Sequence, residues 1–135
     1  MRIYNIFISH SWKYDKHYDS LVKFFNKRNY FDWNNYSVPS TSPIHNAPTN
    51  RELREALVRK ISPCSVVVIL AGQYSTYSKW INEEIKIAQE FGKPIVAVIP
   101  WANERPSAIV QNSAHEIVKW NTNSIVNAIK NNALK

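Results

Sequence analysis

Short apolar runs alternate along this chain with segments whose apolar residues recur at helical spacing. The runs predict five strands, at residues 2–8, 31–33, 64–70, 94–99 and 115–120. The helical spacing predicts four helices, at residues 15–27, 49–62, 78–91 and 124–134. Near-continuous apolar strands that alternate with helices are typical of a parallel sheet covered on both faces. The pattern therefore predicts an α/β fold with a five-stranded parallel sheet.

Local signals set the ends of two of these helices. Residues 49–52 (Thr-Asn-Arg-Glu) form a capping box, and Pro63 closes the helix that they open. Ser78 is a good N-cap for the next helix, and Gly92 ends it. The residues expected to face the core are Tyr14, Tyr18, Leu21, Val22 and Phe25 in the first helix, Leu53, Ala56, Leu57 and Ile61 in the second, Ile81, Ile85 and Ala88 in the third, and Ile125, Ala128 and Ile129 in the last.

The segment 34–48 is the least regular part of the chain. It is rich in Asn, Ser and Thr and contains Pro39, Pro43 and Pro48. This composition predicts a long loop, and loops of about 12 residues or more are often functional.

Trp80 and Glu84 are four positions apart in the first turns of the third predicted helix. Residues at this spacing share one face of a helix, so the two side chains are predicted to form one patch, whereas Glu83 points elsewhere. The helix follows a buried strand, and in an open α/β sheet the ligand crevice lies just beyond the carboxyl ends of the strands. A carboxylate beside an aromatic side chain at such a crevice indicates a catalytic site.

Length and composition favour a single domain that spans residues 1–135. The chain is 44% hydrophobic and 13% aromatic, which speaks against disorder, and no apolar run approaches the roughly 18 residues of a membrane-spanning helix. Its start is too short and too alternating for a secretory signal, and Cys64, the only cysteine, has no intrachain partner for a disulfide. We expect a cytoplasmic location and no membrane contact.

The formal net charge of +7 raises the question of nucleic-acid binding. The basic residues are scattered, and their densest groups lie on predicted helices, where solvated faces normally carry such charge. Nucleic-acid binding is therefore disfavoured, while a general attraction to anionic ligands, nucleotides included, is expected.

Three well-known ligand sites of α/β proteins lack their residues here. A phosphoacceptor receiver needs acidic residues after its first and third strands, but residues 9–11 read Ser-His-Ser and residues 70–72 read Leu-Ala-Gly. Dinucleotide-binding and P-loop turns need several glycines, and the chain has only Gly72 and Gly92. These three functions are excluded.

The histidines and the cysteine do not indicate a metal site or a reactive thiol. His10 and His17 lack acidic or cysteine neighbours at ligand spacing, so no metal is expected. Cys64 follows a proline at the start of a predicted strand, without a basic neighbour that would favour a thiolate, and is expected to pack in the core.

Three segments resemble a known family when they are taken together. Residues 6–11 (IFISHS) end the first strand, residues 78–85 (SKWINEEI) carry a W-x-x-x-E pattern, and residues 92–100 (GKPIVAVIP) contain the next strand. In order and spacing they resemble the TIR domain family, and within it the TIR-like proteins related to ThsB of the Thoeris antiphage system. The resemblance implies a flavodoxin-like TIR fold, and the loop at 34–48 corresponds to the family's BB loop. That loop differs from the Arg-Asp-Pro-Gly pattern of animal signalling members, because residues 36–40 read Tyr-Ser-Val-Pro-Ser.

The resemblance also implies an activity. In catalytic members the glutamate of W-x-x-x-E is needed to cleave NAD+ at the nicotinamide ribosyl bond, and Glu84 occupies that position. Nicotinamide leaves as a neutral molecule and needs no general acid, so one carboxylate can suffice by stabilising the developing cation. NAD+ would be the substrate, with no cofactor and no metal. The residues that the resemblance assigns to substrate binding are Phe7, Ser9, His10, Ser37, Tyr77 and Trp80.

Two functions from different classes remain open. The first is an NAD+ nucleosidase or ADP-ribosyl cyclase that makes a cyclic ADP-ribose isomer, or a related ADP-ribose product, as a signal in bacterial antiphage defence. Such a protein is expected to self-associate, and its product to act on a separate effector protein. The second is a TIR-like interaction module that catalyses nothing, in which Trp80 is a core residue and Glu84 a solvated one. Ser9 would then only cap a strand, and His10 and Tyr77 would be ordinary polar residues.

Overall fold

The computed structural model describes residues 2–9, 15–37, 50–70, 79–99 and 108–134. Five strands form one sheet in the order β2-β1-β3-β4-β5, and every neighbouring pair is parallel. The strands are β1 (Ile3–Ser9), β2 (Asp32–Asn35), β3 (Val66–Leu70), β4 (Ile95–Ile99) and β5 (Glu116–Lys119). The helices are α1 (Asp15–Lys27), α2 (Asn50–Ile61), α3 (Lys79–Glu90), α4 (Ala108–Ser113) and α5 (Thr122–Asn132). The predicted α/β fold class and five-stranded parallel sheet are confirmed.

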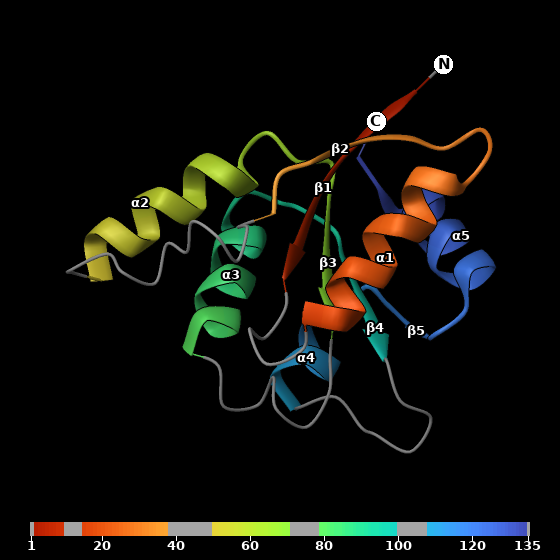
Figure 1. The fold of residues 1–135 in the computed structure, drawn as a ribbon. Helices are drawn as coiled ribbons and strands as arrows, with labels where there is room; N and C mark the ends of the chain where they lie inside the picture. The colour runs from red at the N-terminus through yellow and green to blue at the C-terminus, as the bar shows by residue number, and fades with distance from the viewer. Residues whose placement is uncertain (1, 10–14, 38–49, 71–78, 100–107, 135) are drawn as a thin grey trace.

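Helices cover the sheet on both faces, with α2 and α3 on one side and α1 and α5 on the other (Figure 1). Side chains of a strand point alternately to opposite faces, and each face therefore has its own hydrophobic core. Phe7 and Val67 pack with α2 and α3, whereas Ile8 and Val68 pack with α1 and α5. None of the described helices is long and apolar enough to cross a membrane.

Most of the residues predicted to face the core do so. In the described part of the chain Leu21, Phe25, Leu57, Ile61, Ile85, Ala88, Ile125, Ala128 and Ile129 are buried, whereas Tyr18, Val22 and Ala56 are half-buried. Tyr14 and the side chains of Leu53 and Ile81 lie outside the described residues. The capping box begins at Thr49, and Thr49 and the N-cap Ser78 lie outside them as well.

Some elements differ from the sequence prediction. One of them, α5, begins and ends two residues earlier than predicted. Helix α4 is not predicted, because Val110 is the only buried residue in it and one residue makes no apolar stripe. Strand β2 begins and ends later than predicted and includes Asn34 and Asn35, which are exposed. It forms the edge of the sheet, where a strand needs no continuous apolar run.

Gly92 ends α3, as predicted, through a specific hydrogen-bond pattern. Its φ is +66°, a left-handed conformation that favours glycine. The N–H of Gly92 donates to the carbonyl of Gln89 at 3.1 Å, and the N–H of Lys93 donates to that of Ala88 at 2.7 Å. This pair of bonds is the Schellman motif, which here turns the chain directly into β4.

Candidate active site at the carboxyl edge of the sheet

The order of the strands marks the carboxyl edge of β1 and β3 as the place where a ligand is expected to bind. From β1 the chain crosses to β2 on one side, and it later continues from β3 to β4 on the other side. In open α/β sheets ligands bind where the direction of crossover reverses. Ser9, the last residue of β1, lies at this point and pairs in register with Ile69 of β3.

Glu84 is buried in the second turn of α3, with only 6% of its surface exposed. Its neighbours Ile85 and Ala88 belong to the core between α3 and the sheet. Glu83 differs from it, because its side chain is 30% exposed and its Oε1 lies 3.8 Å from Nζ of Lys86. Helical spacing thus separates two adjacent glutamates into one buried and one partly solvated carboxylate.

Burial raises the pKa of Glu84 from its ordinary value of 4.5 to about 8, because the charged form loses its hydration. The Ser9 hydroxyl acts in the opposite direction and lowers that pKa. The two groups approach each other without forming a hydrogen bond of normal geometry. Within the described residues, neither Ser9 Oγ nor Glu84 Oε2 has a hydrogen-bond partner.

Phe7 and Ser37 occupy well-defined places beside this edge. Phe7 is 1% exposed and packs in the core under α2 and α3. Ser37 Oγ accepts a hydrogen bond from the N–H of Ile8 at 2.9 Å, and the Ser37 N–H donates to Asn35 Oδ1 at 2.9 Å. Ser37 therefore braces the end of β1, and its hydroxyl hydrogen remains able to donate.

Three of the predicted site residues cannot be placed. His10 and Tyr77 lie outside the described residues, and for Trp80 the description is limited to its backbone in α3. Their roles in substrate binding stay predictions. Asn35, which holds Ser37, was missed by sequence reasoning. Its signal is an Asn two positions before the residue that it binds, which is typical of an Asx turn.

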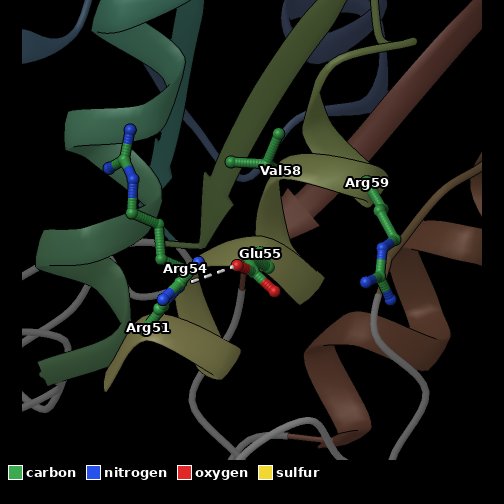
Figure 2. Close-up of a pocket in the computed structure, with 5 residues that line it drawn as sticks. All are labelled: Arg51, Arg54, Glu55, Val58 and Arg59. Carbon is green, nitrogen blue, oxygen red and sulfur yellow. Dashed lines mark hydrogen bonds and ion pairs between the residues drawn. The ribbon is translucent and has the colours of Figure 1, made fainter. Parts of the chain in front are cut away.

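Basic residues outnumber acidic ones in the lining of two hollows formed by described residues. One hollow, of about 440 Å³, lies on α2 and is lined by Arg51, Arg54, Glu55, Val58 and Arg59 (Figure 2). Another, of about 360 Å³, lies at the amino edge of the sheet, at the opposite end from Glu84. Within the described ranges no three His, Cys, Asp or Glu side chains gather closely enough to hold a metal ion.

The model of the family described as "Thoeris protein ThsB, TIR-like domain" matches residues 7–105. The chain belongs to this family. The matched range includes Ser9, Ser37 and Glu84, so the candidate site lies within the TIR-like domain. The recognition made from residues 6–11, 78–85 and 92–100 is confirmed.

Solved structures with low sequence identity share this fold. A conserved protein from Enterococcus faecalis V583 has a TM-score of 0.63 at 14% identity, and the match covers 96% of this chain and 99% of that one. The CMP N-glycosidase BcmB from Clostridium botulinum has a TM-score of 0.57 at 14% identity, and the match covers 93% and 97% of the two chains. No curated protein matches the sequence.

Proposed function

We propose that this ThsB-type TIR-like protein cleaves the bond between nicotinamide and ribose in NAD+, with Glu84 as the catalytic residue. The observation that carries the proposal is the buried carboxyl group of Glu84, which lies beside Ser9 at the carboxyl edge of the sheet. Buried polar groups are almost always hydrogen-bonded, so Glu84 Oε2, which has no partner in the described part of the chain, requires an explanation. A bound ribose hydroxyl would supply the missing partner.

The proposed reaction needs one carboxylate. The bond between C1′ of the ribose and the nicotinamide nitrogen breaks, and its electron pair goes to the nitrogen, which becomes neutral. Positive charge then develops on the ribose, where the ionised Glu84 stabilises it. Water, or an atom of the same molecule, captures C1′ and loses a proton to the solvent, which gives ADP-ribose or a cyclic isomer.

Binding of NAD+ is expected to ionise Glu84. In the empty site the carboxyl group is protonated at neutral pH, because burial raises its pKa to about 8. The nicotinamide ring carries a positive charge, and a nearby positive charge lowers the pKa of a carboxyl group. The substrate would thus displace the proton from Glu84, and cleavage should become faster as pH rises towards 8.

A second candidate reaction is N-glycosidic cleavage of a pyrimidine nucleotide. The structurally similar Clostridium botulinum protein is described as a CMP N-glycosidase. Cytosine is attached as a neutral base and gains from protonation as it leaves, and a carboxyl group with a raised pKa can act as that general acid. If Glu84 works in this way, cleavage should become slower as pH rises through the pKa of Glu84.

We further propose that the product acts as a signal on a separate effector protein in antiphage defence, and that the protein is cytoplasmic and self-associates. Membership in the Thoeris family supports these points. We also propose that an activating partner or a second copy completes the site.

The deciding experiment measures the release of nicotinamide from NAD+ and of cytosine from CMP, with and without an extract of phage-infected cells. Glu84→Gln keeps the shape of the side chain but removes its charge and its proton, so activity should fall by roughly 10²-fold or more. Glu83→Gln is the matched control, because Glu83 is partly solvated and pairs with Lys86, and it should retain activity. Equal rates for wild type and Glu84→Gln would exclude both reactions. Self-association without release of either base would favour the interaction module.

A further inference from the structure

The hollow at the amino edge of the sheet is formed by the starts of three neighbouring strands. Arg2 precedes β1 and Ile3 begins it, Ser65 precedes β3, Lys93 precedes β4, and Leu134 closes the hollow near the end of the chain. The N–H of Leu134 donates to the carbonyl of Ser65 at 2.9 Å, which fixes this wall. The volume of about 360 Å³ lies in the range of small-molecule sites.

This hollow has positive charge and, among its described lining residues, no acidic side chain. The guanidinium carbon of Arg2 lies 4.5 Å from the centre of the Tyr4 ring, so the group is held in place while the N–H groups at its edge stay available. Lys93 is half-buried and forms no ion pair with a described residue. Two basic residues therefore line the same hollow, and its described lining residues supply no counter-charge.

The uncharged polar groups of the hollow are already bonded to one another. Ser65 Oγ accepts from the N–H of Asn5 at 3.1 Å, and Asn5 Nδ2 donates to the carbonyl of Pro63 at 3.2 Å. Cys64 adds no negative charge, because burial raises the pKa of its thiol to about 12 despite the nearby charges of Lys93 and Lys60. The groups left for a ligand are thus the two cations and the exposed apolar side chains of Ile3 and Leu134.

The hollow on α2 differs, although it also contains arginines. Arg51 pairs with Glu55 of the same helix, and Arg54 pairs with Glu90 of α3. Arg54 and Arg59 also project from different sides of α2 (Figure 2). The positive charge of this hollow is partly neutralised and does not converge on one point.

We propose that the amino-edge hollow binds the phosphate group of a small phosphorylated ligand. Arg2 and Lys93 donate charge-assisted hydrogen bonds to the phosphate oxygens. Ile3 and Leu134 contact the apolar part of the ligand, such as the base of a nucleotide. The site is independent of the reaction at Glu84, which lies at the other end of the parallel strands.

The test is a titration of the ¹⁵N-labelled protein at low salt with inorganic pyrophosphate and, separately, with ADP, followed by NMR. Both probes should shift the amide signals of Arg2, Ser65 and Lys93 in a saturable manner, and ADP should bind more tightly. Arg2→Gln and Lys93→Gln should each weaken binding by about tenfold, since each removes one charge-assisted contact. Lys23→Gln removes the same charge from the exposed face of α1 and should leave the affinity unchanged. Thermal unfolding of each variant checks that the fold is retained.

Three outcomes would overturn the proposal. Signals that do not saturate at millimolar probe would mean that there is no site. An equal loss of affinity in Lys23→Gln would mean that only the overall charge attracts the anion. Shifts confined to the α2 hollow, or to the neighbours of Ser9 and Glu84, would place binding elsewhere. Because the readout is binding at named amides, failure here leaves the proposed cleavage of NAD+ untouched.

Discussion

Glu84→Gln should abolish a pH dependence of stability that the buried carboxyl group imposes. In the unfolded chain this group titrates near 4.5, whereas in the folded protein burial raises its pKa to about 8. Between these values the folded state retains a proton that the unfolded state releases. Unfolding therefore becomes easier as pH rises through this window, because the unfolded state binds fewer protons.

The size of the effect follows from the two pKa values. Each pKa unit corresponds to about 1.4 kcal/mol, so the shift from 4.5 to about 8 corresponds to nearly 5 kcal/mol of unfolding free energy when the full window is crossed. Between pH 5 and pH 8 the wild type should lose about 3 to 4 kcal/mol through Glu84 alone. That loss is large against a typical domain stability of about 5 to 15 kcal/mol.

The assay is urea unfolding of wild type and Glu84→Gln at several values between pH 5 and pH 10. Other titrating groups are common to both proteins, so the difference between the two unfolding free energies isolates Glu84. As pH rises, the unfolding free energy of the variant should increase relative to that of the wild type, and the difference should level off above pH 8. A difference that stays constant within about 1 kcal/mol would show that Glu84 is ionised in the folded protein, and the burial argument would then be wrong.

Two further predictions concern serines at the carboxyl edge of the sheet. Ser37→Ala removes the acceptor for the buried N–H of Ile8 and should lower the unfolding free energy by about 1 to 3 kcal/mol. Ser62→Ala is the control, because Ser62 lies in an exposed turn, and it should change the unfolding free energy little. Equal stability of Ser37→Ala and wild type in urea would contradict this prediction. Ser9→Ala removes the hydroxyl that lowers the pKa of Glu84, so the upper end of the pH window should move to higher pH in the same urea series. No movement would show that Ser9 does not influence the carboxyl group.

The fold could be predicted from the sequence wherever burial leaves a periodic pattern. Strands β1, β3 and β4 are almost continuously apolar because helices cover both of their faces, and α1 was predicted with its observed bounds. Edge strand β2 and the short helix α4 bury few residues and leave little pattern. Their positions depend on packing partners that are distant in sequence.

The candidate site was predictable in its location but not in its electrostatics. The i, i+4 spacing and the strand before α3 place Glu84 near the carboxyl edge, and the family match covers this position. The burial of its carboxyl group depends on how closely α3 packs over β1, which no local pattern records. Likewise, the hydrogen bond from Ile8 to Ser37 joins residues that lie 29 positions apart.

The buried thiol of Cys64 can report local unfolding of the protein. It is the only sulfhydryl in the sequence, is 2% exposed, and donates to the carbonyl of Lys60 at 3.1 Å. With its pKa raised to about 12, it should react with a thiol-specific label only when the segment between α2 and β3 detaches from the sheet. The labelling rate therefore measures how often this segment opens in the wild-type protein. A ligand that binds at the amino edge and holds the segment closed should lower that rate.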